Sequence, residues 1–240
     1  MQRVAALGRF IRHARDRGIS IEAVEGDPTM VEAAGLAHAL GRARSIARYQ
    51  AGAPANARLA AIQYDIEPYV LDSWGNYPWD HCGWAEAVRA LAGAVGEPLH
   101  LVLPFWISAD AKGRHFLEEV AGSVRMVTAM AYRTELEALT SAAEPLLAWG
   151  SEQGRPVRVA LETGPVPEEA KAPTALSLEK VGGVSDAATY GSAGSRPTQQ
   201  SRISFLGNEG AMSDAARRAM PALAAWPSFA GVSYHGLEWP

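Results

Sequence analysis

Residues 59–69, LAAIQYDIEPY, decide the fold, because a run with the apolar content of a core strand carries a polar residue at every second position. Successive side chains of a β-strand point to opposite faces, so we expect Gln63, Asp65 and Glu67 to share one face. An open sheet covered by helices on both sides would bury these charges at a cost of several kcal/mol for each unpaired one. A (β/α) barrel has a solvated mouth instead, where its active sites lie. The alternation therefore favours a barrel.

The rest of the chain alternates between short strand patterns and longer helical patterns. Strands are predicted at 19–26, 59–67, 99–107, 124–132, 157–164, 201–207 and 230–236. Helices are predicted between most of them, at 29–49, 83–95, 112–121, 134–153 and 212–225. Strands separated by helix-length segments indicate βαβ units and a parallel sheet. We therefore predict the α/β class and a (β/α)8-type TIM barrel.

The length of the chain fits one domain. Its 240 residues, 48% of them hydrophobic, can bury one barrel-sized core. The segment 164–200 is crowded with Gly, Pro, Ala and Ser, and we interpret it as a long loop inserted in a single domain that spans residues 1–240. A linker between two domains is the alternative, but the C-terminal remainder looks too small to fold alone.

The composition argues against several classes of partner and cofactor. With 22 basic and 26 acidic residues the formal charge is −4, and no basic stripe occurs, so nucleic acid is not an expected partner. Cys82 is the only cysteine, which excludes an internal disulfide and a multi-cysteine metal site. No histidine spacing typical of a metal site occurs, and no loop has the pattern of a phosphate cradle. We expect no metal and no cofactor.

The N-terminus predicts an amphipathic helix. Val4, Leu7, Phe10 and Ile11 fall on one helical face, while arginines interrupt the run, which therefore lacks the apolar core of a signal peptide. No later segment reaches the roughly 18 consecutive apolar residues of a membrane span, so we expect no membrane association.

Several predicted strands end in a polar or aromatic side chain. Trp106 and Glu162 each end a strand, and Tyr234 or His235 ends the last one. In a parallel barrel these carboxyl-terminal ends meet at one rim, which carries the active site. The loop that follows residue 67 adds a cluster of aromatic residues. These residues are the candidates for contact with a ligand.

Two of these strands carry a family resemblance. The segment AIQYDIEPY resembles the fourth strand of the chitinase-like glycoside hydrolases of family 18, which are (β/α)8 barrels with a D-x-x-D-x-D-x-E pattern there. Asp65 and Glu67 match the last two acidic positions, whereas Ala60 and Gln63 occupy the first two. Asp65 therefore lacks the two upstream carboxylates that help to polarise and hold it in that family.

The later strands extend the resemblance. MAYR resembles the Met-x-Tyr pattern of the family's sixth strand, with Met130 and Tyr132 at the matching positions. The ending AGVSYHGLEW resembles the eighth strand, whose aromatic residue floors the sugar site, and here Tyr234 or Trp239 would take that part. The resemblance follows the chain in order over residues 1–240.

The resemblance implies a polysaccharide hydrolase that acts on an amino sugar or a related sugar. Glu67 would be the general acid, the N-acetyl oxygen of the substrate the nucleophile, and Asp65 and Tyr132 would orient and hold that amide. No metal is required. The residues expected to bind the carbohydrate are Gln63, Tyr69, Trp74, Trp106, Met130, Arg133, Glu162, Tyr234, His235 and Trp239.

Three alternatives stay open. A two-carboxylate retaining glycosidase would use Glu67 as acid/base and Glu162 as covalent nucleophile, with the carboxyl groups about 5–5.5 Å apart, although Ile66 stands where that clan usually has Asn. A non-catalytic barrel could bind a glycan through the same mouth. Asp65 and Glu67 could also be structural and pair with arginine side chains.

The strand count indicates that the expected barrel is incomplete. If residues 59–67 are the fourth strand, the sequence begins at the helix before the third, and two strands are missing. Closing a parallel barrel with fewer than eight strands strains its tilt and stagger. An open edge would invite association, so a homo-oligomer through that edge is expected. Localisation stays open, because secretion or export to the periplasm would depend on a missing upstream segment.

Overall fold

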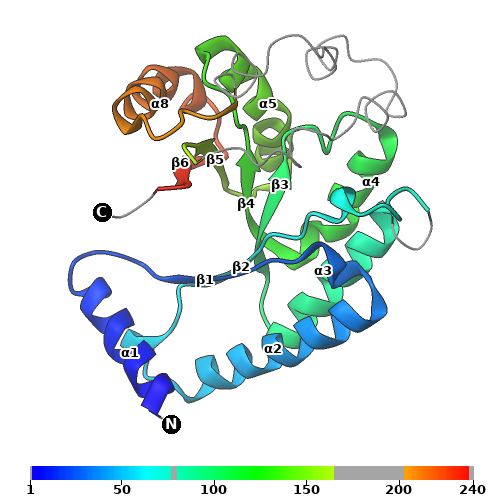
Figure 1. The fold of residues 1–240 in the computed structure, drawn as a ribbon, viewed down its shortest axis with the longest axis vertical. Coiled ribbons are helices and arrows are strands. Elements are labelled where there is room, and N and C mark those ends of the chain that lie inside the picture. Colours follow the sequence, from blue (N-terminus) through cyan, green and yellow to red (C-terminus); the bar gives the residue numbers. More distant parts are fainter. Residues whose placement is uncertain (1, 77–79, 165–202, 238–240) are drawn as a thin grey trace. The chain divides into compact units, whose positions relative to one another are not determined.

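The computed structural model describes residues 2–76, 80–164 and 203–237, which form parallel strands alternating with helices (Figure 1). The strands are β1 Glu22–Glu25, β2 Ala61–Tyr64, β3 Leu99–Pro104, β4 Val124–Met130, β5 Val157–Glu162 and β6 Phe229–His235. Their order in the six-stranded sheet is β1-β2-β3-β4-β5-β6. The pairs β1 with β2, β2 with β3, β4 with β5 and β5 with β6 are parallel.

The helices occur where the sequence predicts them. They are α1 Gln2–Arg15, α2 Ala33–Gly52, α3 His81–Val95, α4 Ala111–Val120, α5 Leu136–Gln153 and α8 Glu209–Leu223. A sequential strand order with a helix after most strands is what repeated βαβ units produce. The α/β class and the parallel sheet are therefore confirmed, while closure into a TIM barrel stays a prediction.

The predicted strand at 201–207 is wrong for the residues that the structure describes there. Only Ser204 makes an isolated parallel bridge, to Glu162, although the Phe205 N–H also donates to the Glu162 carbonyl. The chain turns at once, because Leu206 and Gly207 have φ values of 49° and 78°. Backbone in this left-handed region cannot continue a strand.

Two compact units make up the chain. The first comprises Met1–Val102 and Glu118–Arg125, and the second comprises Leu103–Leu117 and Met126–Pro240. The prediction of a single domain stays a prediction, and residues 165–200 of its expected loop insertion lie outside the described residues. The homo-oligomer expected through an open sheet edge also stays a prediction.

The core of the first unit lies between its strands and the helices α2 and α3. Ile62, Tyr64 and Ile66 are almost fully buried, as is Trp84 at the start of α3. Asp80 caps α3, because its side chain accepts hydrogen bonds from the backbone N–H groups of the first turn. The apolar positions of residues 59–69 therefore form a core face, as the alternation predicts.

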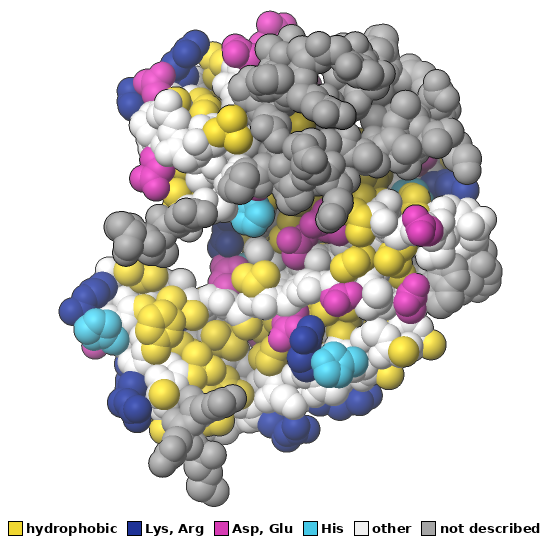
Figure 2. Space-filling view, in the orientation of Figure 1, with side chains coloured by type: hydrophobic (Ala, Val, Ile, Leu, Met, Phe, Trp, Pro, Cys, Tyr) yellow, Lys and Arg dark blue, Asp and Glu magenta, His cyan; other side chains and the backbone are white. Residues whose placement is uncertain are grey.

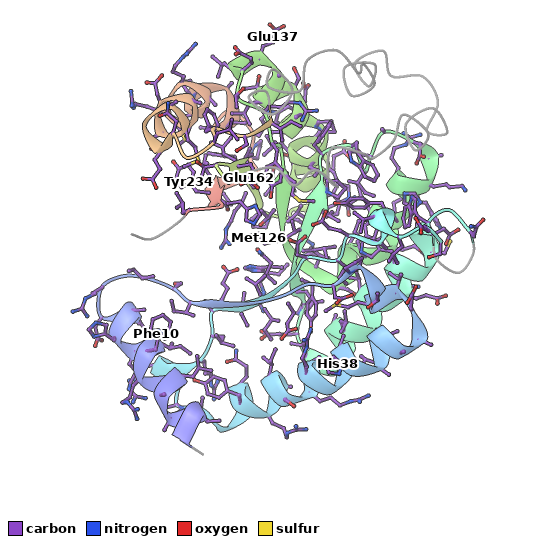
Figure 3. The ribbon with its side chains drawn as sticks, viewed as in Figure 1. Phe10, His38, Met126, Glu137, Glu162 and Tyr234 are labelled. Atoms are coloured by element: carbon purple, nitrogen blue, oxygen red, sulfur yellow. The ribbon has the colours of Figure 1, made fainter. Side chains whose placement is uncertain are left out.

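Helix α1 forms as predicted, but most of its apolar face is exposed. Ile11 is buried, whereas Val4 and Phe10 are each 57% exposed and Leu7 is 36% exposed. Apolar side chains are visible at this end of the molecule in Figure 2, and Phe10 is labelled in Figure 3. Among the described residues, no helix combines the length and the hydropathy needed to cross a membrane.

The core of the second unit lies between its strands and α5. Val157, Val159 and Leu161 of β5 are fully buried on one face, opposite the positions of Arg158 and Glu162. At Gly150 of α5, a Cβ atom would lie 2.5 Å from Val157 Cγ2, so α5 approaches this apolar face closely. The other face of β5 therefore carries its polar side chains, up to the end of the strand.

Candidate functional site

The polar face of β2 continues beyond the end of the strand. Tyr64 ends β2, but the Asp65 N–H still donates to the Glu25 carbonyl at 2.8 Å and extends the ladder by one residue. Gln63, Asp65 and Glu67 are partly exposed, and the apolar residues between them are buried. The predicted alternation is confirmed, and it presents a row of polar side chains at the carboxyl end of this strand.

Glu67 is held by a residue two positions further on. It precedes the short 3-10 helix η3 Pro68–Val70, which folds Tyr69 back so that its hydroxyl donates to Glu67 Oε2 at 2.5 Å. Proline at the first position of a helical turn presets the backbone for it. The Tyr69 hydroxyl therefore orients the carboxylate through one of its two oxygens. The Glu67 side chain makes no other hydrogen bond with the part of the chain that the structure describes.

Aromatic rings cluster beside Glu67. Tyr69 lies 6.5 Å from Trp74 and 6.1 Å from Trp84 between ring centroids, and the two tryptophans lie 6.2 Å apart. Trp84 is fully buried and belongs to the core, whereas Tyr69 and Trp74 are partly exposed. Trp74 packs edge-to-face on the buried Trp84 ring and Tyr69 packs against it at a tilt of 60°, which fixes the two outer rings. They can offer apolar faces to a ligand.

A buried pair that sequence analysis missed lies on the same polar face of the first unit. His100 Nδ1 is 2.9 Å from Glu22 Oε2, and the two side chains are only 6% and 15% exposed. The strand register sets Gln63 beside His100. A single polar residue inside the apolar run LHLVLP was the available signal, because a buried histidine needs a partner.

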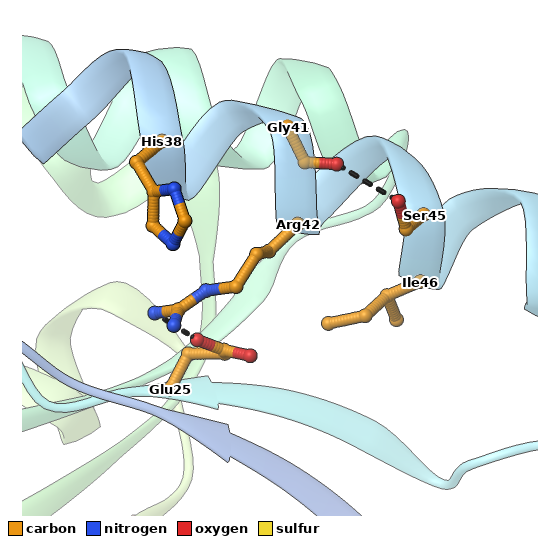
Figure 4. Close-up of a pocket in the computed structure, with 6 residues that line it drawn as sticks. All are labelled: Glu25, His38, Gly41, Arg42, Ser45 and Ile46. Carbon is orange, nitrogen blue, oxygen red and sulfur yellow. Dashed lines mark hydrogen bonds and ion pairs between the residues drawn. The ribbon is translucent and has the colours of Figure 1, made fainter.

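A second cluster in the first unit lines a surface hollow of about 470 Å³ between β1 and α2. Figure 4 shows the Arg42 guanidinium directed at the Glu25 carboxylate, with which it forms an ion pair, and His38 beside it. Tyr64 is paired in register with Glu25, and burial, followed by the charge of Glu25, raises the pKa of Tyr64 to about 12. The ion pair between Arg42 and Glu25 joins α2 to β1 on the core side of the sheet, away from Glu67.

Three neighbouring strands of the second unit end in side chains that meet. Tyr132 follows β4, Glu162 ends β5 and His235 ends β6, and Glu162 and His235 are aligned in register. His235 Nδ1 lies 2.5 Å from Glu162 Oε2 and 3.2 Å from the Tyr132 hydroxyl. The Tyr132 and His235 rings are parallel within 6°, with centroids 5.9 Å apart. These residues form a cluster that we call the Glu162 cluster.

Two glycines let the backbone close over Glu162. The Gly164 N–H donates to Glu162 Oε1 at 2.6 Å. A Cβ atom on Gly236, whose φ is 73°, would lie 2.4 Å from Gly164 N and 2.5 Å from Glu162 Oε1. Only glycine fits such a position. Both carboxylate oxygens are thus engaged, and the Glu162 residue is 8% exposed.

Neither the family models nor the curated proteins compared with this sequence give a match. What points to a function is the geometry of Glu67 with its aromatic neighbours and that of the Glu162 cluster.

The register of β6 separates the two candidates for its end. Tyr234 aligns with the buried Leu161, whereas His235 aligns with Glu162 on the polar face. Figure 3 labels Tyr234 and Glu162 at the ends of these strands. His235 is therefore the member of the pair that joins the polar cluster. Trp239 lies outside the described residues.

The other predicted residues of the second unit lie around these strand ends. Met130 is the last residue of β4 and is 7% exposed, which indicates a core position. The Arg133 guanidinium lies 4.4 Å from the centroid of the Phe105 ring and donates to the Tyr132 carbonyl at 2.8 Å. The cation–π contact with Phe105 fixes the Arg133 guanidinium. Trp106 lies in the turn after β3 and is partly exposed.

The structure brings the predicted residues together in two groups. Asp65, Glu67 and their aromatic neighbours belong to the first unit, and Tyr132 and Glu162 belong to the second. Joint action of Glu67 with Tyr132 or with Glu162 stays a prediction. No group of three or more potential metal ligands occurs among the described residues.

Proposed function

We propose that this protein is a glycoside hydrolase that cleaves an amino-sugar-containing or related polysaccharide, with Glu67 as the general acid and Asp65 and Tyr132 assisting. The observation that supports it best is the position of Glu67. It lies at the carboxyl end of a parallel strand, held by Tyr69 beside partly exposed aromatic rings. Active sites of α/β barrels lie at such strand ends.

The aromatic rings support a carbohydrate as the ligand of this site. The C–H faces of a sugar ring are apolar, and the faces of Tyr69 and Trp74 suit them. Their fixed packing against the core lowers the entropy lost when a ligand binds. A carboxyl group beside such a platform stands within reach of a glycosidic oxygen.

The proposed reaction proceeds in two steps. Glu67 gives its proton to the glycosidic oxygen while the bond from the anomeric carbon to that oxygen breaks and the N-acetyl oxygen of the substrate attacks the same carbon. Asp65 orients the amide, and the Tyr132 hydroxyl donates a hydrogen bond to it. Water then adds to the anomeric carbon, Glu67 recovers a proton from that water, and the N-acetyl group is restored.

The two-carboxylate mechanism ranks second. It needs Glu162 as a nucleophile, and both oxygens of Glu162 are already engaged, one by the Gly164 N–H and the other by His235 Nδ1. A carboxylate held in this way is better suited to orient the imidazole than to attack carbon.

The test compares the wild type with Glu67→Gln and with Glu86→Gln. Glu86 is an exposed residue of α3 in the same unit and serves as the matched control. Release of reducing ends from amino-sugar polysaccharides is measured beside binding of their oligosaccharides, which quenches or enhances tryptophan fluorescence. General-acid catalysis contributes about 10²–10⁴-fold, so we expect a loss of that size in Glu67→Gln alone.

Each alternative has a distinct result. Binding without hydrolysis in all three proteins would identify a glycan-binding barrel. A glycosyl adduct on Glu162 would replace the substrate-assisted mechanism with the two-carboxylate one. Equal hydrolysis by wild type and Glu67→Gln would refute the proposed role of Glu67.

A further inference from the structure

The Glu162 cluster has the arrangement of an oriented imidazole. The Glu162 side chain is 10% exposed, whereas the His235 side chain, 2.5 Å away, is 65% exposed. A buried carboxylate therefore faces one nitrogen of a largely solvent-exposed ring. Buried carboxylates that contact a histidine fix the orientation and the tautomer of its ring.

The contact with Glu162 determines which ring nitrogen of His235 carries the proton. An ionised carboxylate can only accept, so the proton between Glu162 and His235 resides on Nδ1. The Tyr132 hydroxyl is 3.2 Å from the same nitrogen, and the Tyr132 ring is stacked on the His235 imidazole. In a neutral imidazole with Nδ1 protonated, the lone pair is on Nε2. The acceptor atom of His235 is therefore Nε2.

We propose that Glu162 and His235 form an oriented acceptor that binds a hydroxyl group of the carbohydrate through His235 Nε2. The inference rests on the proposed function for the nature of the ligand, and on the second unit alone for the geometry. Glu162 acts as a positioning residue through its contact with His235, and His235 contacts the ligand. The site recognises a hydroxyl donor, because a neutral Nε2 without a proton can only accept a hydrogen bond.

The decisive variant is Glu162→Gln, because the backbone dictates which way the new amide points. The Gly164 N–H must keep its acceptor, so the amide oxygen stays on Gly164 and the amide NH2 faces His235. An NH2 group donates to Nδ1, which moves the ring proton to Nε2 and removes the acceptor there. Glu137→Gln is the control, since Glu137 is an exposed residue of α5 in the same unit.

The first measurement is the tautomer of His235 from the ¹⁵N chemical shifts of its ring, assigned with His235→Gln. We expect the Nδ1–H form in the wild type and in Glu137→Gln, and the Nε2–H form in Glu162→Gln. The Nδ1–H form in all three proteins would overturn the assignment of Glu162 as the residue that sets the acceptor. Near-ultraviolet circular dichroism reports whether each variant is folded.

The second measurement is the rate at which diethyl pyrocarbonate acylates His235, with and without N-acetylglucosamine trimer. In this reaction a ring nitrogen attacks the carbonyl carbon, the bond to the leaving ethyl carbonate breaks, and that group decomposes to carbon dioxide and ethanol. We expect saturating trimer to slow acylation of wild-type His235 at least tenfold. Peptide mass mapping identifies the modified histidine.

Tryptophan fluorescence separates the two ways in which protection could fail. Binding of the trimer without protection of His235 would overturn this inference and leave the proposed function standing. No binding of the trimer would overturn the proposed carbohydrate ligand, and the inference with it. Protection that persists with unchanged affinity in Glu162→Gln would also overturn it, because the acceptor would then be unnecessary.

Discussion

Substitution of Gly236 by alanine tests how tightly the backbone closes over Glu162. Gly236 has a φ of 73°, a region that costs a residue with a Cβ atom about 1–2 kcal/mol. Its Cβ would also lie 2.4 Å from Gly164 N and 2.7 Å from Gly164 Cα. Overpacking against atoms that cannot rotate away costs a further amount of about 1–3 kcal/mol. We expect Gly236→Ala to lower the free energy of unfolding by about 2–5 kcal/mol.

Gly154→Ala is the matched control. Gly154 ends α5 with a φ of 62°, and a Cβ atom there would meet nothing within 4 Å. It should cost only the conformational part, about 1–2 kcal/mol. Urea unfolding followed by circular dichroism gives both values. Equal losses in the two variants would show that the close approach of Gly164 and Gly236 has no energetic consequence, and would refute the reasoning about a closed backbone.

Two further predictions concern the first unit. The pKa of Tyr64 is raised from 10.0 to about 12, so the contribution of its neutral hydroxyl to stability is complete below pH 10 and is lost as the pH rises toward 12. Tyr64→Phe should remove this part of the alkaline destabilisation. Identical pH profiles of the free energy of unfolding for the wild type and Tyr64→Phe would contradict this expectation. Glu22→Ala leaves buried His100 without the carboxylate it contacts and should cost about 1–3 kcal/mol, measured by urea unfolding, against less than about 0.5 kcal/mol for the exposed Glu86→Ala.

Periodicity is why the order of elements could be predicted. Buried apolar residues recur at every second position in β2 and β5. The polar face of β2 could be assigned from Gln63 and Asp65 alone. Side-chain spacing is a local property, so a single sequence reveals it. The segment 201–207 shows the limit, because its strand pattern is overruled by the left-handed backbone at Leu206 and Gly207.

The contacts of the candidate site depend on register, which the sequence does not display. The pairing of Glu162 with His235 follows from the alignment of β5 with β6, whose register shifts between Val157 and Val159. A shift of one residue would have placed Tyr234 there instead. The glycines at 164 and 236 are likewise ordinary turn residues in the sequence, and only the approach of two loops explains them.

The two glutamates at strand ends differ in how their oxygens are used, and this difference divides their proposed roles. Glu162 has one oxygen on the Gly164 N–H and the other on His235, so proton transfer to a ligand would break a buried hydrogen bond. Glu67 has one oxygen on Tyr69 and lies partly exposed. A loss of kcat in Glu67→Gln together with a rise of KM in Glu162→Gln would follow from this division, because an acid acts in the transition state and an oriented acceptor binds the substrate throughout.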